Sequence, residues 1–173
     1  MNNIVLIGMP GCGKSTVGIV LAKMLGYNFI DSDLLIQESE GKLLCKIISE
    51  DGTDAFNKIE NKVNASIQAT KCVIATGGSV VYGREAMAHL RNIGIVVYIQ
   101  LPYEEIKTRL GDLTQRGVSM KSGQTLLSLY NERVPLYRKY AHITVDEQGL
   151  DISAVADKIR RAVGEHIKSG GVL

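Results

Sequence analysis

Apolar residues in this chain fall into two patterns, short continuous runs and longer segments in which they recur every third or fourth position. The continuous runs predict buried strands over residues 4–8, 28–31, 72–76, 94–101 and 142–146. The segments with helical spacing predict helices over residues 15–26, 32–40, 43–50, 53–69, 103–111 and 151–168. Because strands alternate with helices, we expect an α/β fold: a five-stranded parallel sheet with helices on both faces.

Two segments lack either pattern. The polar, glycine-bearing stretch 111–124 (GDLTQRGVSMKSGQ) predicts a mobile loop, and the last residues, 169–173 (SGGVL), predict a flexible tail. Residues 1–168 together have about the length of one domain, and no internal repeat divides them. We therefore expect a single domain that carries one mobile loop.

Composition narrows the classes of function. Hydrophobic residues make up 45% of the chain and the net charge is only +2, with no cluster of basic residues, so nucleic acid is not the expected partner. No apolar stretch reaches the ~20 residues that a membrane span requires. Cys12, Cys45 and Cys72 lack the spacing of a zinc site or disulfide framework, and we expect them to be small buried apolar residues. The prediction from composition is a cytoplasmic protein, and we expect it to be a monomer.

Residues 8–15, GMPGCGKS, match the phosphate-loop pattern G-x-x-x-x-G-K-[ST] in full. Glycines let the backbone curl so that successive N–H groups point at phosphate oxygens, and the following helix adds the positive end of its dipole. In this pattern Lys14 contacts the β- and γ-phosphates, and the Ser15 hydroxyl ligates Mg²⁺. Since the loop joins a predicted strand to a predicted helix, we expect it to bind ATP or GTP with Mg²⁺.

A pair of aspartates, Asp31 and Asp33, follows the second predicted strand. Ligands of open α/β sheets gather at the carboxyl ends of the strands, where the phosphate loop also lies. We predict that one carboxylate faces the Mg²⁺ held by Ser15, while its neighbour faces the pocket of the phosphate acceptor and accepts a hydrogen bond from a hydroxyl. The alternative is that Asp33 only caps a helix beginning at Leu34.

The phosphate loop, the sequence FIDSD at 29–33 and the block GTDAFNKIE at 52–60 together resemble shikimate kinase. The resemblance continues through ATGGSVV at 75–81, Arg116 and ERVPLYRKYAHITVD at 132–146, and it covers nearly the whole chain in family order. It implies a P-loop kinase fold with a mobile lid at about 111–124. It also implies that ATP phosphorylates the 3-hydroxyl of shikimate, a step of aromatic amino-acid biosynthesis.

The resemblance further implies roles for single residues. Asp33 would hold the shikimate hydroxyls and orient or deprotonate the attacking one, while the Gly78 N–H group and the Arg133 guanidinium would bind the rest of the substrate. The expected nucleotide-binding residues are Gly11, Cys12, Gly13, Lys14, Ser15, Thr16, Arg109 beside the adenine, and Arg116 from the lid. The expected catalytic residues are Lys14, Asp33 and Arg116, and those expected near the metal are Ser15 and Asp31.

Two substrate-side positions depart from the family pattern. Asn57 stands where the family carries an arginine that binds the substrate carboxylate, and losing one such hydrogen bond weakens binding roughly 10- to 100-fold. Ser79 stands where a third glycine is usual, and a serine there costs about 1–2 kcal/mol if the position needs a positive φ. These departures leave open a kinase for another hydroxylated acid or polyol, and a nucleotide-binding protein without kinase activity. A nucleoside monophosphate kinase is a third alternative.

Overall fold

The computed structural model of the chain describes residues 3–110 and 118–170. Its strands are β1 (Asn3–Ile7), β2 (Asn28–Asp31), β3 (Cys72–Ala75), β4 (Gly94–Gln100) and β5 (Ile143–Asp146). Neighbouring strands are parallel throughout, in the order β2-β3-β1-β4-β5. The predicted five-stranded parallel sheet is confirmed, and each strand boundary agrees with its prediction to within one residue.

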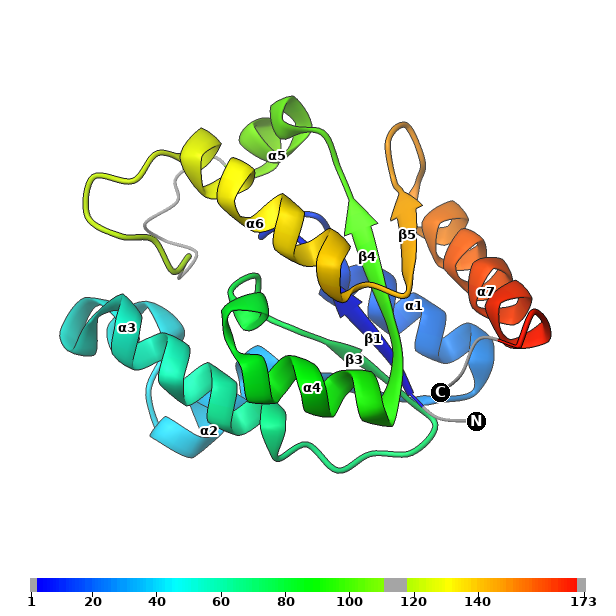
Figure 1. Cartoon of the computed structure of the whole chain (residues 1–173), viewed down its shortest axis with the longest axis horizontal. Coiled ribbons are helices and arrows are strands. Elements are labelled where there is room, and N and C mark those ends of the chain that lie inside the picture. The colour runs from blue at the N-terminus through cyan, green and yellow to red at the C-terminus, as the bar shows by residue number, and fades with distance from the viewer. Residues whose placement is uncertain (1–2, 111–117, 171–173) are drawn as a thin grey trace.

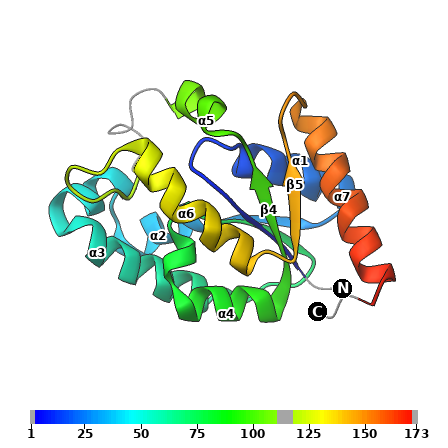
Figure 2. The same ribbon diagram turned by 45° about the horizontal axis from the view of Figure 1, so that its top comes forward.

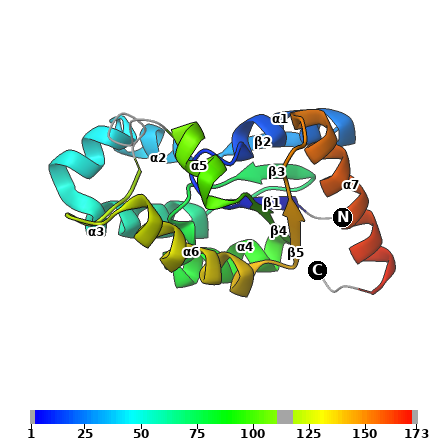
Figure 3. The same ribbon diagram turned by 90° about the horizontal axis from the view of Figure 1, so that it is seen from above.

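Helices cover both faces of this sheet (Figure 1). Seen from above, α1 (Lys14–Leu25) and α7 (Ile152–Lys168) lie on one side of the strands, and α4 (Arg84–Ile93) and α6 (Leu126–Tyr140) lie on the other (Figure 3). Every residue of β1 (NIVLI) and β3 (CVIA) is buried. Central strands of a parallel sheet are buried on both faces, which explains why their sequences are continuous apolar runs.

Helices α2 (Ser32–Glu40) and α3 (Leu44–Ala65) lie together at one end of the molecule, where α3 also packs against α4. Ile36, Ile47 and Phe56 make a small apolar cluster between them, distinct from the main core around the sheet. Gly52, with φ 84° and ψ 167°, interrupts α3, so its two halves correspond to the predicted helices 43–50 and 53–69. Only glycine adopts this conformation without strain, and the break therefore follows directly from the sequence.

Three elements were not expected from the apolar pattern: the short 3₁₀ helix η1 (Val80–Tyr82) and the helices α4 and α6. Helix α6 contains Pro135, which lacks the N–H that a helix interior uses. Its inward face also carries a fully buried arginine, Arg133, between Leu129 and Tyr137. A charged residue on the buried face hides the apolar stripe by which a helix is recognised. Helix α5 (Tyr103–Leu110), in contrast, was expected and lies beyond the carboxyl end of β4 (Figure 2).

The remaining predictions have mixed outcomes. Cys12 and Cys72 are buried as expected, whereas Cys45 is only partly buried. Within residues 3–110 and 118–170, no helix combines the length and the apolarity needed to traverse a bilayer. Residues 118–124 contain neither helix nor strand, but the first half of the predicted lid and the end of the predicted tail lie outside the described residues. The lid therefore stays a prediction.

Candidate active site

The phosphate loop borders a cavity of about 360 Å³ at the carboxyl ends of β1, β2 and β3. Gly11 and Gly13 have φ values of 80° and 81°, the left-handed region that glycine alone enters freely, and Gly13 directly precedes α1. Lys14 is buried, and its Nζ donates hydrogen bonds to the carbonyl oxygens of Gly8 and Met9, both at 2.9 Å. The predicted loop thus places its lysine and the N-terminus of α1 at the cavity wall.

Ser15 and Asp31 lie together beside the loop. The Ser15 hydroxyl donates to Asp31 Oδ2 at 2.6 Å, and the other carboxylate oxygen, Oδ1, accepts from the backbone N–H of Asp33 at 3.0 Å. Asp31 is therefore the N-cap of α2, which begins at Ser32. The alternative in which Asp33 caps a helix beginning at Leu34 is wrong, because Asp33 lies inside the first turn and its side chain is free for another use.

Asp33 and Glu60 bring two carboxyl groups to the wall of this cavity. The Asp33 Oδ1 and Glu60 Oε1 atoms are buried, and neither has a hydrogen-bond partner among the described residues. Burial, with the charge of Asp31 as a smaller cause, raises the pKa of Asp33 to about 6. Burial also raises the pKa of Glu60 to about 7. Unpartnered buried oxygens are uncommon in folded proteins, so this pair points to a ligand with hydroxyl groups.

The loop after β3 approaches the cavity closely. A Cβ atom on Gly78 would lie 2.7 Å from Pro10 Cδ and 3.0 Å from Arg133 Nη1, so only glycine fits there. Ser79 has φ −90°, an ordinary value for any residue. The expected strain at Ser79 is therefore absent, and its hydroxyl instead donates to Glu60 Oε2 at 2.5 Å.

Arg133 lines the same cavity from α6 and is only 1% exposed, so it is not a solvated helix arginine. Its Nη2 donates to the carbonyl oxygen of Ser119 at 2.6 Å, and its Nε donates to the Tyr82 hydroxyl at 3.3 Å. Tyr137, one turn further along α6, donates to the Gly78 carbonyl oxygen at 2.6 Å. These bonds fix a buried cation beside the loop after β3, and sequence reasoning gave no sign of Tyr82 or Ser119 as its partners.

Asn57 is not among the residues that line this cavity. It borders a second cavity of about 190 Å³, and its Oδ1 accepts a hydrogen bond from the Ser119 hydroxyl at 3.0 Å. Ser119 lines both cavities, so it stands between Asn57 and Arg133. The structure therefore does not bring Asn57 together with Asp33, Gly78 and Arg133.

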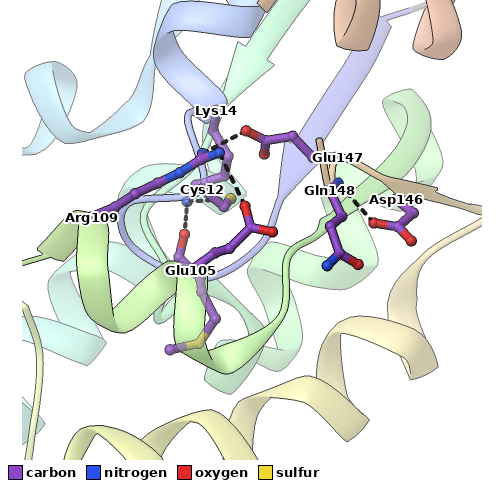
Figure 4. A network of polar contacts seen from close by, with 8 residues as sticks. Cys12, Lys14, Glu105, Arg109, Asp146, Glu147 and Gln148 are labelled. Carbon is purple, nitrogen blue, oxygen red and sulfur yellow. Dashed lines mark hydrogen bonds and ion pairs between the residues drawn. The ribbon is translucent and has the colours of Figure 1, made fainter. Parts of the chain in front are cut away.

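Arg109 lies at the other side of the phosphate loop, held by two carboxylates (Figure 4). Its Nη1 is 2.5 Å from Glu147 Oε1, and its Nη2 is 3.6 Å from Glu105 Oε2. Glu147 follows β5, is 5% exposed, and is a residue that sequence reasoning missed because it is 38 positions from its partner. The expected nucleotide residue Arg116 lies outside the described residues.

The pair Ser15 and Asp31 has the chemistry of a magnesium site. Mg²⁺ prefers oxygen ligands and is usually bound by one or two carboxylates together with substrate phosphates and water. The hydroxyl and carboxylate here meet that requirement at the phosphate loop. Among the described residues no group of three or more His, Cys, Asp or Glu forms a metal cluster.

A parallel sheet whose first strand leads into a phosphate loop, with a carboxylate-lined cavity beside that loop, defines a P-loop kinase. The family model for shikimate kinase matches residues 10–164, and the chain belongs to the shikimate kinase family. A shikimate kinase from Clostridium botulinum (strain Eklund 17B / Type B) is 37% identical, covering 94% of this chain and 97% of the relative. One from Nostoc punctiforme is 38% identical, covering 96% and 93%.

The solved structures agree with this assignment. The shikimate kinase from Acinetobacter baumannii in complex with shikimate matches with a TM-score of 0.87 and 32% identity, covering 96% of this chain and 94% of that one. The shikimate kinase from Aquifex aeolicus matches with a TM-score of 0.80 and 29% identity.

Proposed function

We propose that this protein transfers the γ-phosphoryl group of ATP to the 3-hydroxyl of shikimate. The observation that carries the proposal is a single cavity lined by Lys14 of the phosphate loop, by the Asp33 carboxylate and by the Arg133 guanidinium. Phosphoryl transfer requires alignment and positive charge more than covalent chemistry, and this cavity combines a cation for phosphate, a base for a hydroxyl and a cation for an acid. The solved relative with shikimate bound supports the same acceptor.

On the nucleotide side, the N–H groups of residues 11–16 and the Lys14 ammonium bind the phosphates, and Arg109 borders the adenine. Ser15 and Asp31 hold Mg²⁺, which supplies charge neutralisation at the phosphate oxygens. Arg116 adds a further cation from the lid. The roles of Arg109 and Arg116 rest on the family resemblance.

On the acceptor side, Asp33 orients the attacking hydroxyl and takes its proton as the new oxygen–phosphorus bond forms and ADP departs. A base works best when its pKa lies near the operating pH, and a pKa of about 6 leaves Asp33 mostly ionised at neutral pH. Arg133 binds the carboxylate of the acceptor, and the Gly78 N–H group binds it from the loop after β3. Asn57 contributes from the neighbouring cavity through its hydrogen bond with Ser119.

An ADP-release assay with shikimate, gluconate and a panel of other hydroxy acids tests the proposal. We expect the highest kcat/KM with shikimate and loss of turnover in Asp33→Asn. Faster turnover of another acid would identify a related kinase, and phosphorylation of AMP or CMP would identify a nucleoside monophosphate kinase. ATP binding by calorimetry without any product would identify a nucleotide-binding protein without kinase activity. Size-exclusion chromatography tests the predicted monomer.

A further inference from the structure

Ser79 makes a short, buried hydrogen bond that links two parts of the acceptor pocket. Its hydroxyl donates to Glu60 Oε2 at 2.5 Å, and the two residues are 3% and 1% exposed. Ser79 belongs to the loop between β3 and η1, whereas Glu60 belongs to α3. A hydrogen bond to a carboxylate is short and about twice as strong as a neutral one, so this contact fixes the Glu60 side chain against the loop.

This bond leaves the other oxygen of Glu60, Oε1, buried at the wall of the cavity and without a partner among the described residues. Glu60 Oε1 lies 2.2 Å from the point that a Cβ atom on Gly77 would occupy, and Asp33 Oδ1 lies 2.8 Å from the same point. The two atoms are thus within about 5 Å of each other, and neither has a partner among the described residues. Both residues line the cavity. Glu60 therefore presents a hydrogen-bond acceptor beside that of Asp33.

Glu60 has no cation in contact to fix this orientation instead. In the described part of the chain no lysine, arginine or histidine nitrogen lies within 4.0 Å of its carboxylate. Arg133 of α6 and Lys14 of α1 act on it only at longer range, and Asp33 of α2 acts on it as a like charge. Asn57, three residues earlier on α3, is bonded to Ser119. Within the described residues, the Ser79 hydroxyl is the side-chain donor that Glu60 has.

We propose that Ser79 is a positioning residue of the acceptor pocket, which holds Glu60 so that its free oxygen accepts a hydrogen bond from a hydroxyl group of the acceptor next to Asp33. The proposal rests on the proposed function, since it assumes a hydroxylated acceptor in this cavity. It gives the serine that follows Gly77 and Gly78 a role, because its hydroxyl is the side-chain donor that holds Glu60.

Ser79→Ala tests the proposal, with Ser79→Gly as a second variant and Ser66→Ala as the matched control. Ser66 also carries a bonded hydroxyl at the end of α3, but it is exposed and donates only to the Val63 carbonyl oxygen. We expect the KM for the acceptor to rise about 10-fold in both Ser79 variants, with the KM for ATP unchanged and the control like the wild type. Unchanged acceptor KM in folded Ser79 variants would overturn the proposal, and so would failure of both variants to fold.

The pH dependence provides a readout that a purely structural role does not move. The Ser79 hydrogen bond lowers the pKa of Glu60, so its removal raises that pKa above about 7. The pH profile of kcat/KM for the acceptor should contain a midpoint that is due to Glu60 and is therefore absent in Glu60→Gln. We expect this midpoint to lie at higher pH in Ser79→Ala than in the wild type. Adding Asn57→Arg to Ser79→Ala should return this midpoint to lower pH and restore the KM for the acceptor. Residues three apart on a helix are neighbours, so the new guanidinium would lie beside the Glu60 carboxylate. An unshifted midpoint would contradict the proposal.

Carboxyl ¹³C NMR separates this proposal from the proposed function. The pKa of Glu60, assigned through Glu60→Gln, can be measured in the wild type and in Ser79→Ala without any acceptor. If the wild type turns over no acceptor, the proposed function fails. A higher pKa in the variant would then still show that Ser79 holds Glu60, and an equal pKa would reject the Ser79 proposal.

Discussion

Replacing Glu60 by glutamine is expected to stabilise the protein at neutral and alkaline pH. Glu60 is 1% exposed, and burial raises its pKa from 4.5 to about 7, despite the opposing effects of Ser79, Arg133 and Lys14. Glutamine has nearly the same shape and can still accept the Ser79 hydrogen bond through its carbonyl oxygen. The substitution therefore removes a buried charge while leaving the packing in place.

The sign and size of the effect follow from the two pKa values. Since the pKa of the folded state is higher, the native state binds the proton more tightly, and the associated stability is present below about pH 4.5 and lost as the pH rises through about 7. A change from 4.5 to about 7 corresponds to about 3 kcal/mol. The glutamine NH₂ group lacks a partner, which lowers the stability of the variant by about 1–3 kcal/mol at every pH. The difference between variant and wild type should therefore increase by about 2–3 kcal/mol from pH 5 to pH 8.

Urea unfolding followed by circular dichroism at pH 5, 6, 7 and 8 measures this difference. Glu38→Gln, which changes an exposed glutamate on α2, is the control, and its difference from the wild type should be small because no buried charge is removed. A free-energy difference for Glu60→Gln that stays flat over this range would refute the reasoning, because it would mean that Glu60 has the same pKa in the folded and unfolded chain.

Three further substitutions test the site. Asp33→Asn should lower kcat at least about 100-fold while the calorimetric Kd for ATP stays unchanged; substantial residual turnover would exclude Asp33 as the base. Asn57→Arg should lower the KM for shikimate about 10-fold in steady-state assays, and a higher KM would mean that the pocket is shaped for a different acceptor. Glu147→Gln should raise the KM for ATP about 3- to 10-fold, since it releases Arg109 from its 2.5 Å ion pair, with the acceptor KM as internal control.

Much of the fold was predictable because its signals are local. The strands of the sheet are continuous apolar runs, and the break in α3 coincides with Gly52. The phosphate loop was predictable for the same reason, since its glycines and Lys14 are consecutive in the sequence. These features depend on the backbone conformation of neighbouring residues, which sequence patterns record directly.

The parts that were not predicted depend on contacts between distant residues. Ser79 would have been strained at a positive φ, but it has an ordinary φ of −90° and bonds to Glu60, 19 positions away. Asn57 bonds to Ser119, 62 positions away, a contact that no sequence pattern indicated. Helix α6 was not predicted because Arg133 interrupts its apolar face. A buried guanidinium needs hydrogen-bond partners, and these come from residues that are brought near only in the folded structure.

The division of the apolar interior has a consequence for how this enzyme can evolve. Asp33 and Glu60 stand on helices packed around Ile36, Ile47 and Phe56, whereas the nucleotide loop is anchored in the large core of the sheet. Mutations that reshape the small cluster can retune which alcohol is recognised while the ATP half keeps its framework. Substitutions in the small cluster therefore act first on the Asp33 and Glu60 side of the acceptor pocket, whereas Arg133 is held on α6, which packs against the main core.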